Sequence, residues 1–179
     1  MSANIIDGKA ISAAVKEQVR DEIARDKLTV GLAVVIVGDD PASRVYVNNK
    51  KKACEFCGIK SYEYALPAET TQEELLELVD TLNADKNVNG ILVQLPLPKH
   101  LDEKAVIERI SPDKDVDAFH ESNVGRIMIG NYSFLPCTPA GVLELLDAYA
   151  IPIRGRHCLI LGRSLLVGRP LAQLLTSRD

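Results

Sequence analysis

Apolar and polar residues follow one another along the chain in blocks that predict helices and strands in alternation. Residues 8–25 have an apolar residue at every fourth position from Ile11, which predicts an amphipathic helix. Residues 28–37 are a continuous run rich in β-branched residues that predicts a strand buried on both faces, residues 88–95 predict another buried strand, and residues 61–66 a shorter one. Because strands alternate with helices, the pattern predicts an open parallel α/β sheet built from βαβ units.

Capping residues indicate where two of the predicted helices begin and end. Pro41 suits the first turn of a helix that continues to about residue 57, and Gly58 is typical of its end. Thr71 and Glu74 form a capping box, Thr-x-x-Glu, which predicts the start of the next helix.

The last third of the chain begins a second series of elements. After a predicted helix around residues 102–110, the polar residues 111–136 are expected to be irregular. Thr138 is followed by proline, which predicts a helix whose first N–H groups are capped by the Thr138 hydroxyl. Residues 157–161 predict another buried strand, which leads into a final apolar helix. We therefore expect a first α/β domain to about residue 137 and the start of a second domain after it.

Composition and charge exclude several classes of protein. Of the 179 residues, 46% are hydrophobic, which excludes wholesale disorder, and the formal net charge of −4 argues against a nucleic-acid or anionic membrane partner. No apolar run approaches the roughly 18 residues of a membrane span. The first residues lack the basic and apolar regions of a secretory signal. We expect a soluble cytoplasmic protein.

The four cysteines favour free buried thiols over a redox or metal site. Cys54 and Cys57 form a C-x-x-C motif, but it lies near the end of a predicted helix, where the helix dipole does not activate a thiol. Cys137 and Cys158 are too dispersed to complete a zinc site, so no metal is expected.

A polar stripe on the helix after the first strand is the first candidate for chemistry. Ser43, Tyr46 and Lys50 follow the pattern S-x-x-Y-x-x-x-K and fall within about 60° of arc at 100° per residue. A lysine amine that is partly withdrawn from water suits acid–base catalysis. The neighbouring Lys51 and Lys52 leave a solvated helix face as the alternative interpretation.

A glutamine at the end of a buried strand is the second candidate. Gln94 belongs to the run VQLPLP, and ligands of open α/β sheets bind outside the carboxyl ends of the strands. The alternative is a capping glutamine before a rigid turn.

The run DKDVDAFH is the third candidate: Asp117 lies among apolar residues, where its carboxylate can accept hydrogen bonds from the N–H groups of a ligand. The alternative is a solvated acidic loop.

The run GRSLLVG, between the last predicted strand and helix, is the fourth candidate. Gly162 permits a tight turn, Gly168 permits close packing, and the N-terminus of the following helix attracts a phosphate. The run departs from G-x-G-x-x-G because Ser164 replaces the second glycine. Arg163 suits the additional phosphate of NADP.

In order along the chain, these segments resemble the bifunctional methylenetetrahydrofolate dehydrogenase/methenyltetrahydrofolate cyclohydrolase family. The resemblance implies oxidation of 5,10-methylenetetrahydrofolate by NADP and hydrolysis of the product to 10-formyltetrahydrofolate, in one-carbon metabolism and purine biosynthesis. It implies a folate-binding catalytic domain over residues 1–137 and, over 138–179, a connecting helix and the first βα unit of a Rossmann-type NADP-binding domain. The motifs that carry the resemblance are IIDGK, PASRVYVNNKKKAC, GILVQLPLP, SPDKDVDAFH, NVGR, LPCTPAGV and GRSLLVGRP.

The resemblance assigns a role to each candidate residue. Lys50 is the acid–base residue of the hydrolysis, Gln94 holds it in position, Tyr46 lies against the pterin rings, and Asp117 binds the polar edge of the pterin. These four are the expected catalytic residues. The expected substrate-binding residues also include Ser43, Leu95 and Pro96, and those expected to bind NADP are Thr138, Gly162, Arg163, Ser164, Val167 and Gly168.

Two departures from the family pattern bear on activity. Ala118 stands where the family usually has glycine, which is costly if the backbone there has a positive φ angle. A dinucleotide-binding fold needs several further βα units, roughly another hundred residues, so we expect the chain to be a fragment and Asp179 not to be the true terminus. The family implies a homodimer at full length.

Two other interpretations remain open. Shikimate and amino-acid dehydrogenases also have a substrate domain ahead of a nucleotide domain, although they give no reason for VQLPLP beside the polar stripe. The short chain also fits a folate-binding module without turnover.

Overall fold

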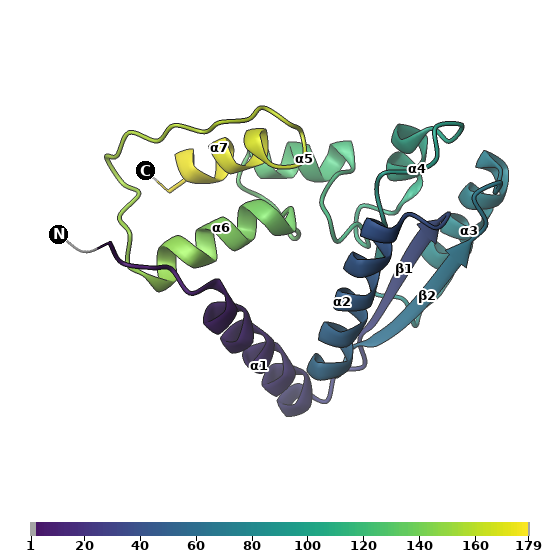
Figure 1. Cartoon of the computed structure of the whole chain (residues 1–179), viewed down its shortest axis with the longest axis horizontal. Helices are drawn as coiled ribbons and strands as arrows, with labels where there is room; N and C mark the ends of the chain where they lie inside the picture. The colour runs from purple at the N-terminus through teal and green to yellow at the C-terminus, as the bar shows by residue number, and fades with distance from the viewer. Residues whose placement is uncertain (1–2, 179) are drawn as a thin grey trace. The chain divides into compact units, whose positions relative to one another are not determined.

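The computed structural model describes residues 3–178, which fall into two compact units (Figure 1). Lys16–Val116 form one unit, and the described residues before and after this range form the other. Asp179 lies outside the described residues. Helix α1, Gly8–Asp26, is divided between the units, and the structure confirms its predicted position. No helix in the described part of the chain is both long enough and apolar enough to cross a membrane.

A parallel sheet lies at the centre of the Lys16–Val116 unit. Its strands are β1 (Gly31–Val37), β2 (Lys60–Leu66) and β3 (Gly90–Val93), in the order β2-β1-β3 within the described residues. Val35 of β1 pairs with Tyr64 on one side and Val93 on the other. The predicted parallel α/β architecture is confirmed, although β1 and β3 are shorter than the apolar runs that predicted them.

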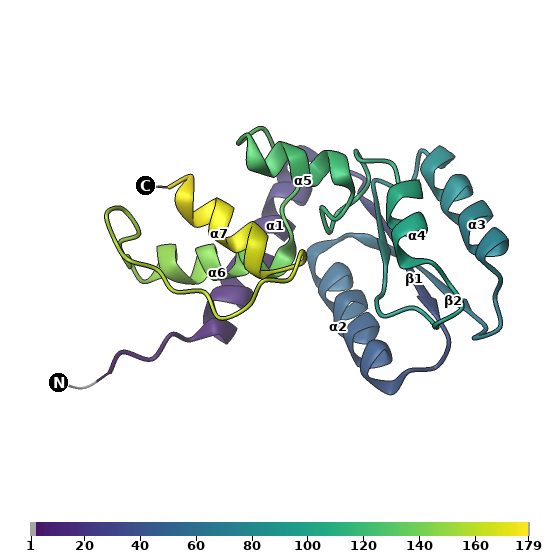
Figure 2. The ribbon, with the colours of Figure 1, turned by 90° about the horizontal axis from the view of Figure 1, so that it is seen from above.

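Helices cover both faces of the sheet (Figure 2). Helix α2 (Pro41–Cys57) packs on one face, and α3 (Gln72–Ala84) with α4 (Glu103–Arg109) on the other. Successive side chains of β1 point to opposite faces, so both faces must be apolar. The face under α2 includes Val34, Ile36, Val47 and Leu92, and the other face includes Ala33, Val35, Leu75, Val79, Leu82 and Val106.

The capping residues begin and end these helices as predicted. Pro41 is at the start of α2, where Asp40 accepts a hydrogen bond from the Ser43 backbone N–H at 2.7 Å, and Gly58 ends the helix with a φ angle of 79°. Thr71 and Glu74 make both hydrogen bonds of the capping box at the start of α3. Local sequence therefore determines both limits of α2 and the start of α3.

The segment after α4 is anchored along β3. The Ile91 backbone N–H donates to the Lys114 carbonyl at 2.7 Å, and the Lys114 amine donates to two carbonyls at the end of α3, those of Leu82 and Asp85. Val116 lies so close to Gly90 that a Cβ atom at position 90 would collide with it. Glycine is therefore required at this position of β3.

The other unit contains α5 (Glu121–Met128), α6 (Cys137–Ala148) and α7 (Gly168–Thr176) around a small apolar core. The expectation of an irregular segment over residues 111–136 is wrong because it contains α5. This helix includes Gly125 and Asn123, which are weak helix formers, so its sequence does not indicate a helix. Burial of Asn123 and Ile127 supplies the stabilisation that local propensity lacks.

The predicted cap of α6 is also wrong. The helix begins at Cys137, one residue before Thr138, and no described side chain caps its first N–H groups. Pro139 therefore lies within the first turn, which tolerates proline because those N–H groups have no partner inside the helix. Pro139 is buried in this first turn.

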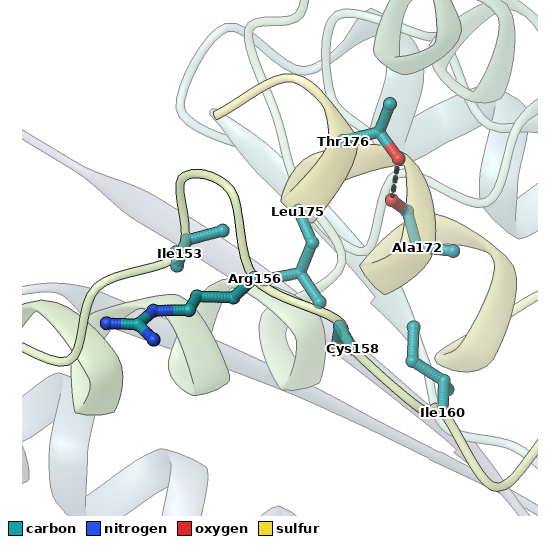
Figure 3. Close-up of a pocket in the computed structure, with 7 residues that line it drawn as sticks. All are labelled: Ile153, Arg156, Cys158, Ile160, Ala172, Leu175 and Thr176. Atoms are coloured by element: carbon teal, nitrogen blue, oxygen red, sulfur yellow. Dashed lines mark hydrogen bonds between the residues drawn. The ribbon is translucent and has the colours of Figure 1, made fainter. Parts of the chain in front are cut away.

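Residues 157–161 are not a strand, contrary to the prediction. Leu159 and Leu161 are 84% and 92% exposed, and only Ile160 packs against the core of this unit. A strand buried on both faces needs neighbouring strands for its hydrogen bonds, and the described part of this unit has none. Beside the segment lies a pocket of about 270 Å³, whose lining includes Cys158, Ile160 and Leu175 (Figure 3). The Arg156 side chain, at the edge of this pocket, points away from α7.

Candidate active site

Gln94 lies at the carboxyl end of β3, at the point where the strand order of the sheet reverses. Its backbone N–H donates to the Val35 carbonyl at 2.8 Å, which continues the pairing of β3 with β1 by one residue. The crossover from β1 passes over one face of the sheet and that from β2 over the other, so this edge is a topological switch point. The fold therefore places Gln94 where open α/β sheets bind ligands.

A hydrogen bond joins Gln94 to Lys50. The Lys50 amine donates to Gln94 Oε1 at 2.8 Å, and Gln94 Nε2 donates to the Leu95 carbonyl at 2.8 Å. The second bond fixes the orientation of the amide, so that its oxygen faces the amine. Lys50 is half-buried. The structure thus brings together two predicted residues that are 44 positions apart, and a freely solvated helix face does not describe Lys50.

The other members of the stripe differ from Lys50 in exposure. Ser43 is buried at the start of α2, where hydrogen bonds from its backbone and then its side chain lower the pKa of Asp40. Tyr46 is 62% exposed, and no hydrogen bond within residues 3–178 joins it to Lys50. Its ring is therefore open to a flat ligand beside the amine.

The loop after Gln94 is fixed by a residue that the sequence did not single out. The Leu95–Pro96 peptide bond is cis, Leu95 is half-buried, and Pro96 is exposed. The Leu97 N–H donates to a carboxylate oxygen of Glu103 at 2.9 Å. Glu103 is the first residue of α4, and a carboxylate at the start of a helix after a proline-rich turn is the only sequence signal that indicates it.

Asp117 follows the segment that is anchored along β3, and its side chain is half-buried. The buried carboxylate of the run DKDVDAFH is Asp115, which is 2% exposed. The sequence did not single it out, because nothing in the run distinguishes the environment of one aspartate from that of the other two. Ala118, the next residue after Asp117, has a φ angle of 55°. The position thus has the left-handed backbone for which the family's glycine is suited.

The predicted nucleotide-binding turn is tightly folded before α7. Gly162 has a φ angle of 145°, and a Cβ atom at Gly168 would collide with the Gly162 carbonyl oxygen. Ser164 Oγ accepts hydrogen bonds from the N–H groups of Val167 and Gly168, at 3.1 and 3.4 Å. Arg163 is exposed. The turn therefore gathers these five predicted residues in one place.

Thr138, the remaining residue expected to bind NADP, is not joined to this turn by a hydrogen bond among the described residues. It is exposed in the first turn of α6.

The cysteines are free but only partly as expected. Cys54 and Cys57 are buried, and burial raises the pKa of the Cys54 thiol, which disfavours the reactive thiolate. Cys137 and Cys158 are exposed, so the expectation of burial is wrong for these two. The described residues contain no group of three or more His, Cys, Asp or Glu side chains that could hold a metal ion.

Two family models match the chain. The model described as the tetrahydrofolate dehydrogenase/cyclohydrolase catalytic domain matches residues 6–117, and that described as the NAD(P)-binding domain of the same enzymes matches residues 136–179. The first match includes the Lys50–Gln94 pair, and the second includes the turn before α7.

Curated relatives and solved structures agree with these matches. "Bifunctional protein FolD" of Acetivibrio thermocellus is 56% identical over 182 residues, and that of Ruminiclostridium cellulolyticum is 57% identical over the same length. Each alignment covers all of this chain but 64% of the relative. The bifunctional FolD enzyme of Campylobacter jejuni has a TM-score of 0.95 at 49% identity, over 99% of this chain and 64% of that one.

A second solved structure was obtained with bound molecules. The Trypanosoma brucei methylenetetrahydrofolate dehydrogenase-cyclohydrolase, complexed with NADP cofactor and an inhibitor, has a TM-score of 0.95 at 37% identity. The alignment covers all of this chain and 63% of that one. The chain thus spans less than two thirds of the length of these proteins.

Proposed function

This chain belongs to the tetrahydrofolate dehydrogenase/cyclohydrolase family, and we propose that it carries the catalytic part and the beginning of the NADP-binding part of such an enzyme. The enzyme oxidises 5,10-methylenetetrahydrofolate with NADP and hydrolyses the product to 10-formyltetrahydrofolate. We assign residues 1–137 to the folate-binding domain and 138–179 to the connecting helix and first part of the NADP-binding domain. The family match over residues 6–117 supports the first assignment, and the match over 136–179 supports the second.

The Lys50–Gln94 hydrogen bond is the observation that carries this proposal. In the hydrolysis, water adds to the methenyl carbon, one proton is lost, and the bond from that carbon to N5 of the folate breaks. The Lys50 amine accepts the proton of the attacking water and returns a proton to N5 as the bond breaks. Because Gln94 Oε1 accepts one N–H of the amine at 2.8 Å, the rest of the amine is directed toward the substrate.

The remaining predicted residues bind and orient the substrate. The exposed ring of Tyr46, one helical turn before Lys50, provides a face on which a pterin ring stacks. We assign Ser43, Leu95 and Pro96 to the walls of the same folate site. The carboxylate of Asp117 accepts hydrogen bonds from pterin N–H groups. Hydride transfer depends on the alignment of two carbon atoms, so these residues contribute mainly through position.

The turn over residues 162–168 fits a dinucleotide phosphate. Its two glycines allow the backbone to fold on itself, and the Ser164 hydroxyl, which accepts two backbone N–H groups, still has its own hydrogen to donate. The N-terminus of α7 adds its positive dipole end, and Arg163 suits a further phosphate. We place Thr138 and Val167 among the NADP-binding residues as well. NADP, when bound, supplies the hydride acceptor.

We further propose that the protein acts in the cytoplasm and that the full-length enzyme is a homodimer. The family resemblance supports both statements. Sedimentation of the full-length protein tests the second, because a monomer at micromolar concentration contradicts it.

Replacement of Lys50 by methionine tests the proposed chemistry. Methionine keeps an unbranched side chain but has no amine, so we expect hydrolysis of 5,10-methenyltetrahydrofolate to slow by about a hundredfold or more. The absorbance of the methenyl compound follows the reaction, and circular dichroism confirms folding. Lys52→Met is the matched control, because Lys52 is an exposed lysine on the same helix.

The outcomes separate the proposal from its alternatives. An unchanged rate in Lys50→Met contradicts the role of Lys50. Calorimetric binding of 5,10-methenyltetrahydrofolate without any hydrolysis by the unmodified chain would favour a folate-binding module.

A further inference from the structure

A hydrogen bond to Glu103 anchors the middle of the loop between β3 and α4. Leu97 lies between two prolines, which have no N–H to donate, and it is 7% exposed. Its own N–H donates to Glu103 Oε1 at 2.9 Å. A carboxylate that accepts a backbone N–H makes a stronger bond than a neutral acceptor, and its loss leaves a buried donor without a partner.

Glu103 is held in place by the start of α4 and its contact with α3. It is the first residue of α4, and Asp102 before it caps the helix by accepting the N–H groups of Lys104 and Ala105. The Asp102 N–H in turn donates to the side chain of Gln72 in α3 at 2.8 Å. The carboxylate of Glu103 is therefore attached to a fixed part of the unit.

A short series of contacts connects this anchor to the catalytic lysine. Leu97 is joined through the cis-bonded Pro96 to Leu95, whose carbonyl accepts the Gln94 Nε2 group. The oxygen of the same amide accepts the Lys50 amine. Pro96 restricts its own backbone and that of Leu95 before it, so displacement of Leu97 shifts the carbonyl that orients the amide.

We propose that Glu103 is a positioning residue for the Lys50–Gln94 pair. It acts on the reaction through Leu97 and the Leu95 carbonyl and does not touch the substrate. This inference rests on the proposed function, because it assigns Glu103 a part in the same hydrolysis.

Two substitutions of Glu103 test the proposal through the rate of hydrolysis. Glu103→Ala removes the acceptor, and we expect kcat for 5,10-methenyltetrahydrofolate to fall about tenfold or more. Glu103→Gln keeps an oxygen acceptor of the same length and should restore kcat to within about threefold. Glu73→Ala is the matched control, because Glu73 is an exposed first-turn glutamate of α3. A rate in Glu103→Ala equal to that of Glu73→Ala overturns the proposal.

A double-mutant cycle with Gln94 separates positioning from a general loss of stability. If Glu103 acts through Gln94, the Glu103→Ala change should have almost no further effect on kcat in a Gln94→Ala background. Decreases that multiply in the double variant would show that Glu103 acts by another route, and would overturn the proposal.

A measurement without turnover keeps the two proposals distinguishable. The side-chain amide of Gln94 gives its own nuclear magnetic resonance signals, which we expect to shift in Glu103→Ala and to return in Glu103→Gln. Unchanged Gln94 signals in Glu103→Ala overturn the positioning role. Absence of both hydrolysis and folate binding in the unmodified chain defeats the proposed function instead, while the Gln94 signals still decide the role of Glu103.

Discussion

At the scale of single residues, Ala118 combines two demands that no side chain satisfies fully. Its φ angle of 55° favours glycine, but the residue is also buried in the apolar core of its unit. Alanine has the smallest side chain that fills this space. The sequence alone identified the departure from the family pattern, and the backbone angle shows why it matters.

Substitutions of Ala118 should therefore have unequal effects on stability. Ala118→Gly relieves the backbone but loses a buried methyl group and gains unfolded-state entropy, so we expect the free energy of unfolding to change by less than about 1 kcal/mol. Ala118→Val places a branched side chain in a left-handed, packed position and should cost about 2 kcal/mol or more. Urea unfolding of the two variants measures the difference, and similar values for both would contradict this account.

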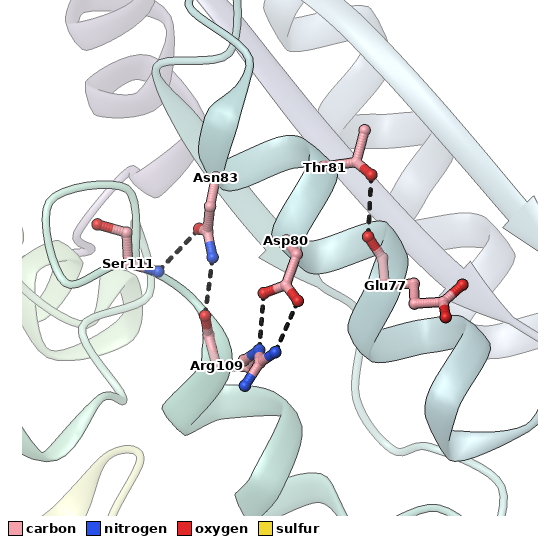
Figure 4. Close-up of polar contacts among 6 residues, drawn as sticks. All are labelled: Glu77, Asp80, Thr81, Asn83, Arg109 and Ser111. Carbon is pink, nitrogen blue, oxygen red and sulfur yellow. Dashed lines mark hydrogen bonds and ion pairs between the residues drawn. The ribbon is translucent and has the colours of Figure 1, made fainter.

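At the scale of elements, α3 and α4 are joined by side chains as well as by the apolar core (Figure 4). Arg109 donates two hydrogen bonds to the carboxylate of Asp80, and Asn83 donates to the Arg109 carbonyl while accepting the Ser111 N–H. This set of contacts fixes the end of α4 against α3. It thereby helps to hold the start of α4, where Glu103 lies.

The ion pair of Asp80 in α3 with Arg109 in α4 should make the stability of the protein depend on pH. Hydrogen bonds from Arg109 lower the pKa of Asp80 below its ordinary value of 3.8. A lowered pKa in the folded state means that the pair stabilises the protein above that ordinary value. The contribution declines as the pH falls below 3.8 and is lost once the pH has passed the lowered pKa.

Thermal unfolding of Asp80→Asn across pH measures this contribution. We expect the variant to have a lower Tm than the unmodified protein at about pH 6, and the difference to shrink toward zero in acid. Glu77→Gln is the control, because Glu77 is an exposed glutamate on the same helix (Figure 4). A difference in Tm that stays constant at every pH argues against the pair as its cause.

At the scale of the whole molecule, apolar residues in the last third of the chain are not always buried. Residues 157–161 have the composition of a buried strand, yet Leu161 is 92% exposed. Leu75 of α3, in contrast, is fully buried in the core under the sheet. The two leucines have the same chemistry but opposite environments.

Unfolding free energies of leucine variants should reveal this contrast. Leu75→Ala creates a cavity and should cost about 2 to 5 kcal/mol. Leu161→Ala removes an exposed side chain and should change stability by less than about 0.5 kcal/mol. Denaturant unfolding of each variant, followed by circular dichroism, provides the comparison. A large loss in Leu161→Ala would mean that the segment is buried in solution.

The sequence predicted those residues of the candidate site that neighbouring positions in the chain identify. The stripe of Ser43, Tyr46 and Lys50 follows from helical periodicity, and Gln94 follows from the end of an apolar run. The role of Glu103 and the burial of Asp115 were not predicted, because the first depends on a hydrogen bond to the Leu97 N–H and the second on pairing with Ile91 of β3.

By itself, the sequence determined the parallel α/β unit, both limits of α2, the start of α3, and the family. These depend on apolar periodicity and on capping groups within a few positions of one another, which a linear pattern records. Only the tertiary structure decided that Lys50 bonds to Gln94, that α5 forms, and that residues 157–161 pair with no strand among residues 3–178. Each of these depends on groups distant in the chain, because hydrogen-bond partners and buried surface are supplied by whichever elements pack against the residue.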